Sequence, residues 1–122
     1  MRLRFVLLFS LLFSLSLSLS AQDKTDDEIN HLLNYVKTTK CIYIRNGDKH
    51  DGPDAMNHIK RKYDYFEDDI HSAEDFIRLS ATKSTMSGKK YYIKCPGEPK
   101  IESGRWMLDE LKRYRKIEKQ GK

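Results

Sequence analysis

Residues 41–54 read CIYIRNGDKHDGPD, and this stretch decides the fold. Its first part, residues 41–45, is β-branched and aromatic and predicts a strand. Asn46-Gly47 comes next and is the strongest short turn signal in the chain, because both residues tolerate the positive φ angles of a two-residue hairpin. Asp48–His50 can then return as a short second strand. The stretch therefore predicts a β-hairpin.

Helices are predicted on both sides of this hairpin. Thr25 and Glu28 form a capping-box pattern, so the first helix is expected over Asp26–Thr38. Asp51, Ser72 and Ser103 are the predicted caps of three further helices. Each of the four helices has a set of apolar or small residues that we expect on its buried face. In chain order, these sets are Ile29, Leu32, Leu33 and Val36; Ala55, Met56, Ile59, Tyr63 and Phe66; Ala73, Phe76, Ile77 and Ser80; and Trp106, Met107, Leu111 and Tyr114.

A further strand is predicted at Tyr91–Cys95, where aromatic and β-branched residues precede a Pro-Gly-Glu-Pro stop at residues 96–99. Together these elements indicate an α+β fold in one domain, with about four helices and a small two- or three-stranded antiparallel sheet. The domain is expected to cover residues 25–116, and residues 117–122 are expected to form a basic C-terminal tail.

The first twenty residues differ from the rest. Arg2 and Arg4 precede an almost purely apolar run at residues 5–13, and small residues follow. This order is typical of a secretory signal peptide over residues 1–20, with cleavage after Ser20 or Ala21. A membrane anchor is the alternative, but the apolar run is shorter than the roughly 20 residues that cross a bilayer. We therefore expect a periplasmic or secreted protein with no transmembrane segment after cleavage.

The net charge limits the kinds of partner that we expect, and the cysteine content predicts a disulfide. The chain has 23 basic and 18 acidic residues, and removal of Arg2 and Arg4 leaves a net charge of +3, which is too small to indicate nucleic acid binding. Cys41 and Cys95 are the two cysteines, and in an exported domain they predict a disulfide worth up to about 4 kcal/mol. The sequence indicates no cofactor, and another envelope protein is a possible partner.

Several blocks of residues also occur in an order that points to a family. They are Tyr43–His50 (YIRNGDKH), Ala55 with His58 and Lys62, Ser72–Ile77 (SAEDFI), and Ser84–Lys89 (STMSGK) followed by Tyr91 and Ile93. This order resembles the YfeK-like family of small exported proteins of Gram-negative bacteria, a domain of unknown function. The resemblance covers roughly residues 28–111. It implies a periplasmic location and no established activity.

Candidate binding residues are drawn from these blocks. Hydroxyls, a glycine and a lysine in the loop from Ser84 to Tyr91 could hold an anion, although serines in such loops often bond the local backbone instead. Arg45 could contact a carboxylate or phosphate, or simply pair with Asp48 or Glu74. The predicted binding set is Arg45, Asn46, His58, Ser84, Ser87, Lys89 and Tyr91.

The sequence also offers two other kinds of chemistry, a metal site and a hydrolase. His50, Asp54 and His58 could together hold Zn²⁺, but a surface Asp–His pair explains the same spacing, and we predict no metal site. A small cell-envelope hydrolase would need His58 to activate Ser84 or Ser87. We expect a non-catalytic binding or interaction module, with that hydrolase or an enzyme inhibitor as the alternative functions.

Overall fold

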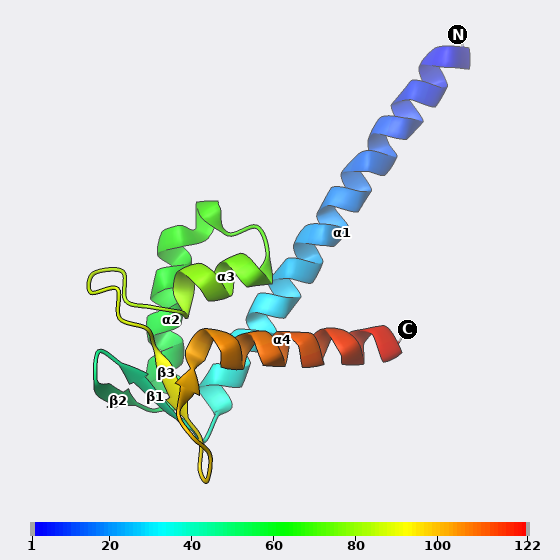
Figure 1. The fold of residues 1–122 in the computed structure, drawn as a ribbon. Coiled ribbons are helices and arrows are strands. Elements are labelled where there is room, and N and C mark those ends of the chain that lie inside the picture. Colours follow the sequence, from blue (N-terminus) through cyan, green and yellow to red (C-terminus); the bar gives the residue numbers. More distant parts are fainter. Residues whose placement is uncertain (1, 122) are drawn as a thin grey trace.

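Four α-helices and a four-stranded antiparallel sheet occur within the described residues (Figure 1). The computed structural model describes residues 2–121, and their side chains from residue 20 onward. In chain order the elements are α1 (Arg2–Thr38), β1 (Ile42–Arg45), β2 (Asp48–His50), α2 (Gly52–Phe66), the 3-10 turn η1 (Glu67–Asp69), α3 (Ala73–Ser80), β3 (Tyr92–Lys94), β4 (Ile101–Glu102) and α4 (Ser103–Gln120). The predicted α+β class is confirmed.

The hairpin forms as predicted. Asn46 and Gly47 have φ angles of 50° and 83°, so the turn uses the left-handed conformation at both central positions. Tyr43 pairs with His50, and Arg45 pairs with Asp48. Side chains alternate between the two faces of a strand, so this register places Tyr43 in the core.

The sheet has one strand more than the sequence predicts. Its order is β2-β1-β3-β4, with every neighbouring pair antiparallel. β4 consists of Ile101 and Glu102 alone, and it pairs with β3 through Ile93 and Tyr92. A two-residue strand lacks the alternating pattern by which longer strands are predicted.

Two of the four predicted helix caps are confirmed. The side chains of Asp51 and Ser72 accept hydrogen bonds from the backbone N–H three residues later. The cap at Ser103 is wrong, because α4 begins at Ser103 itself and Glu102 occupies the N-cap position. Ser103 is instead fully buried beside the sheet, where packing decides its place.

The capping box at Thr25 is also wrong, because α1 does not begin there. The helix runs from Arg2, and the Thr25 hydroxyl donates to the Ala21 carbonyl one turn earlier. The N-terminal part of α1 extends away from the other elements (Figure 1). The side chains of residues 2–19, which make up most of the predicted signal peptide, lie outside the described part. At the other end, residues 117–120 of the predicted basic tail continue α4.

One apolar cluster joins all the helices and the sheet. The predicted buried faces supply most of it, with Met56 and Tyr63 packed at its edge. Its members are Ile29, Leu32, Leu33, Val36, Tyr43, Ala55, Ile59, Ala73, Phe76, Ile77, Ala81, Tyr91, Ile93, Trp106, Met107 and Leu111. Trp106, which is 9% exposed, therefore belongs to the core.

Ion pairs connect α1 and α3 to α4. Arg115 makes a two-point contact with the buried Glu28 at 2.7 and 3.0 Å, and a second two-point contact with Glu74. The carboxylate of Glu110, also buried, lies 2.7 Å from His31 and accepts two hydrogen bonds from Arg113. Both buried carboxylates are thus paired, as burial of charge requires.

The predicted disulfide between Cys41 and Cys95 is present. It joins the chain just before β1 to the chain just after β3, at the end of this strand pair where Ile42 faces Lys94. Arg45 and Tyr91 lie at the opposite end of the same two strands. The disulfide therefore braces the strand pair from which two of the predicted binding residues extend.

Candidate functional site

Six of the seven predicted binding residues line one pocket with a volume of about 490 Å³. They are Arg45, Asn46, His58, Ser84, Ser87 and Tyr91. The hairpin turn and the loop of residues 83–90 lie on the same side of the molecule, next to α2 (Figure 1). Lys89 is exposed and is not among the lining residues. A concave site of this size is typical of small-molecule binding.

A hydrogen-bonded chain forms the polar wall of the pocket. Arg45 Nη1 lies 2.6 Å from His58 Nδ1, and His58 Nε2 lies 3.1 Å from the Tyr91 hydroxyl. The same Arg45 nitrogen lies 3.4 Å from Nε2, so its closer contact is with Nδ1. A guanidinium can only donate, so we assign Nδ1 as the acceptor and place the ring proton on Nε2. His58 is therefore neutral and donates to Tyr91. Lys62 Nζ donates to the same hydroxyl over 3.4 Å.

This arrangement leaves the Tyr91 hydroxyl hydrogen without an acceptor among the described residues. The oxygen accepts from His58 and from Lys62, so the hydroxyl is free to donate elsewhere. Burial raises the pKa of Tyr91, which keeps the hydroxyl protonated at neutral pH. Tyr91 therefore offers the pocket a hydrogen-bond donor.

The charged residues in the wall of the pocket are all positive. Burial, together with the neighbouring charges of Arg45, Lys62 and Arg61, lowers the pKa of His58 to about 4. Burial and the charge of Arg45 also lower the pKa of Lys62. Within residues 20–121, none of these three cations forms an ion pair. Glu74 pairs with Arg115 instead, and Asp48, although it is the register partner of Arg45 in the hairpin, forms no side-chain ion pair with it. No acidic residue lines the pocket.

The serines of the loop are held by local hydrogen bonds. Ser84 Oγ accepts from the Ser87 backbone N–H, and Ser87 Oγ donates to Asn46 Oδ1 over 2.8 Å and accepts from the Lys89 backbone N–H. Lys62 adds a 2.6 Å bond to the Lys83 carbonyl. These contacts fix the loop against the hairpin turn and α2. In the described part of the chain, no hydrogen bond joins His58 to either serine.

Half of the residues that line the pocket were not predicted from the sequence. The additional residues are Arg61, Lys62, Tyr65, Phe66, Thr85 and Met86. Four of them follow His58 at helical spacings of three, four, seven and eight, so they share its face of α2. That periodicity could have identified them. Phe66 was predicted to be core, but it lies at the end of α2, where the helix leaves the core and borders the pocket.

The zinc hypothesis is not supported. His50 Nδ1 contacts Asp54, whereas His58 faces Arg45 and Tyr91. The described residues contain no cluster of three or more side chains suited to hold a metal ion. His50 and Asp54 thus form the surface pair that the same spacing allows.

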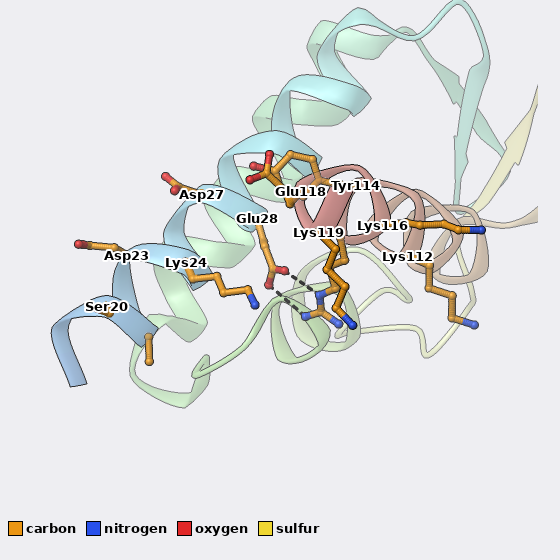
Figure 2. Close-up of a pocket in the computed structure, with 12 residues that line it drawn as sticks. Ser20, Asp23, Lys24, Asp27, Glu28, Lys112, Tyr114, Lys116, Glu118 and Lys119 are labelled. Carbon is orange, nitrogen blue, oxygen red and sulfur yellow. Dashed lines mark hydrogen bonds and ion pairs between the residues drawn. The ribbon is translucent and has the colours of Figure 1, made fainter. Parts of the chain in front are cut away.

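A larger hollow of about 900 Å³ lies between α1 and the C-terminal half of α4 (Figure 2). Of its lysines, Lys24 and Lys119 lie beside the Glu28–Arg115 ion pair, whereas Lys112 and Lys116 point away from it (Figure 2). Asp23, Asp27 and Glu118 share this rim, so the charges are mixed. Arg115 is already paired, and acidic residues line this hollow, whereas none lines the smaller pocket.

The fold and the pocket define a small α+β domain with one disulfide and a cationic pocket at the end of its sheet. Among the described residues, no helix is both long enough and apolar enough to cross a membrane. The chain belongs to the Family of unknown function (DUF5329), which matches residues 23–115. The resemblance to YfeK-like proteins is thereby confirmed.

A curated relative supports the same assignment. The chain is 36% identical over 64 residues to the uncharacterized protein YfeK of Salmonella typhimurium (strain LT2). That match covers 52% of this chain and 53% of YfeK, so it spans about half the length of each protein. No solved structure matches the chain.

Proposed function

We propose that this domain is a non-catalytic binding module of the periplasm or the extracellular space, and that the cationic pocket is its binding site. The observation that carries the proposal is the excess of donors. Arg45, Lys62 and the Tyr91 hydroxyl all face a pocket that no acidic residue lines. Unpaired charge at a partly buried site is costly, and a ligand that accepts hydrogen bonds would offset that cost.

The hydrogen bonds of His58 fit a binding role better than a catalytic one. A general base needs a free lone pair within reach of the nucleophile. The lone pair of His58 is occupied by Arg45, and its ring proton is directed at Tyr91. His58 therefore holds Arg45 and Tyr91 in place. An inhibitor function would require a large protein surface, whereas the pocket has the volume of a small-molecule site.

The disulfide supports the proposed location, because such bonds persist in oxidising compartments. The signal-peptide pattern of residues 1–20 agrees with it.

Backbone amide NMR spectra with a fragment library of anionic, neutral and cationic compounds would test the site. We expect shifts to cluster at Arg45, His58 and Tyr91, and to be lost in the Arg45→Gln variant. Arg105→Gln is the matched control, since Arg105 is an exposed arginine on α4 that does not line the pocket. Shifts that cluster elsewhere, or an absence of shifts across the library, would contradict the proposal.

A separate experiment tests the proposal that the domain is not a hydrolase. Hydrolysis of 4-nitrophenyl acetate should be the same for the wild-type protein and for Ser84→Ala, Ser87→Ala and His58→Gln. If the wild-type protein hydrolysed the ester and one of these variants did not, the hydrolase would become the better-supported function.

A further inference from the structure

The rim of the cationic pocket is apolar and exposed. Met86 at the tip of the loop is 99% exposed, and Tyr65 on α2 is 81% exposed. They come from separate elements and border the same pocket. Phe66 lies beside Tyr65, with their ring centroids 4.8 Å apart. Large apolar side chains that remain in water at the mouth of a pocket are typical of a binding surface.

The two halves of the pocket therefore demand different ligand chemistry. The donors of Arg45, Lys62 and Tyr91 fit the oxygen atoms of a carboxylate or a phosphate. The side chains of Tyr65, Phe66 and Met86 fit a flat or flexible apolar body, since methionine and aromatic rings adapt to such surfaces. Lys62 lies 5.1 Å from the centroid of the Tyr91 ring, so the cationic and aromatic groups are interleaved.

We infer that the ligand is a small oxyanion joined to an aromatic or aliphatic body, with the oxyanion on Arg45, Lys62 and Tyr91 and the body against Tyr65 and Met86. The inference rests on the proposed function and specifies its ligand class. The pocket volume of about 490 Å³ fits such a molecule rather than an extended polymer.

Five probes separate the contributions in calorimetric titrations. 1-Naphthoate and 1-naphthyl phosphate carry both halves, acetate and inorganic phosphate carry the oxyanion alone, and 1-naphthylmethanol carries the body alone. We expect at least one naphthyl oxyanion to bind about ten-fold or more tightly than either of its halves. The carboxylate and phosphate arms then identify which oxyanion the site prefers.

Variants assign each half to its residues. Arg45→Gln should weaken the naphthyl oxyanions about ten-fold or more and leave 1-naphthylmethanol nearly unchanged. Met86→Ser and Tyr65→Ser should weaken the naphthyl compounds and leave inorganic phosphate unchanged. Both positions are exposed, so these variants retain the core. Ile117→Ser is the matched control, because Ile117 is a half-exposed apolar residue of α4 outside this pocket.

The outcomes keep the two proposals distinct. If inorganic phosphate binds as tightly as 1-naphthyl phosphate and Met86→Ser has no effect, the amphipathic ligand is wrong while the binding site stands. If only neutral or cationic fragments bind in the pocket, the ligand class is likewise wrong. If no compound of any class binds there, both the inference and the proposed function fail.

Discussion

Burial and the neighbouring cations keep His58 neutral by lowering its pKa, so the folded protein loses stability in acid. Its pKa is about 4 in the folded protein, against about 6.5 in an unfolded chain. Between these values the unfolded state binds more protons, so stability falls as the pH falls. The contribution of neutral His58 is complete above pH 6.5 and is lost toward pH 4. Protonation would also break the hydrogen bond from Arg45 to Nδ1.

We expect the wild-type protein to lose about 1 kcal/mol more than His58→Gln between pH 7 and pH 4.5, because solvent screens a partly exposed ring. Urea unfolding of both proteins at several pH values measures the difference. NMR titration of the ring gives the pKa directly, and Arg45→Gln should raise it. A wild-type ring that titrates near pH 6.5 would contradict the deduced wall of the pocket.

Gly52 allows α2 to begin against the end of α1. A Cβ atom at this position would lie 2.6 Å from the carbonyl oxygens of both Val36 and Lys37. Those are backbone atoms, so the two helices would have to separate. We expect Gly52→Ala to lower the free energy of unfolding by about 2 kcal/mol or more.

The control for this change is Gly121→Ala. Gly121 has a helical φ of −77°, and its nearest contact would be an ordinary 3.7 Å. That variant should stay within about 0.5 kcal/mol of the wild-type protein in urea unfolding. Equal stability of the two variants would show that the helices do not meet closely at Gly52.

At the level of single residues, parts of the candidate site could be predicted wherever a short sequence pattern marked them. Asn46-Gly47 identified the turn, and the His58 and Ser84–Tyr91 blocks identified two walls. The cationic wall was harder to predict, because Arg61 and Lys62 resemble a solvated helix face until the loop folds over them. Neither the neutral state of His58 nor the unpaired state of Arg45 is visible without the partners that the fold supplies.

Among the elements, α4 depends on Arg115 for its connection to α1 and α3. Removing this arginine would leave the Glu28 carboxylate, which is 4% exposed, without its partner. We expect Arg115→Met to lower the free energy of unfolding by about 3 kcal/mol. Adding Glu28→Gln to that variant should restore part of the loss, since the buried charge is then gone.

Arg105→Met removes an exposed arginine from the same helix and serves as the control. Its effect should stay within about 0.5 kcal/mol in urea unfolding. If Arg115→Met changed the free energy of unfolding equally little, the ion pair would be a surface contact that does not stabilise the fold.

The element boundaries show where local patterns stop being informative. Thr25 and Glu28 have the spacing of a capping box, but the chain before them is also helical, so no helix end exists to be capped. Serine is a common capping residue, but Ser103 directly follows β4, and its side chain is buried in the core. Ile101 and Glu102 form a strand only because β3 lies beside them.

For the whole molecule, the central prediction concerns export. We expect the protein from a periplasmic or secreted fraction to begin at Ala21 or Gln22, after removal of residues 1–20 or 1–21. We also expect Cys41 and Cys95 to resist thiol labelling until they are reduced. Intact mass spectrometry, with and without reductant, measures both properties. A product that begins at Met1 with two reactive thiols would overturn the proposed location.

The disulfide and the pocket occupy opposite ends of the β1–β3 pair, and this separation has a consequence for the life of the protein in the cell. Cytoplasmic reductants would cut the covalent tie without altering a single residue that meets the ligand. A copy that stayed in the cytoplasm would then be cleaved more readily by proteases, because a sheet without its disulfide unfolds more often. If the protein is exported as proposed, the bond that supports the sheet would also favour the copies that reach the oxidising compartment.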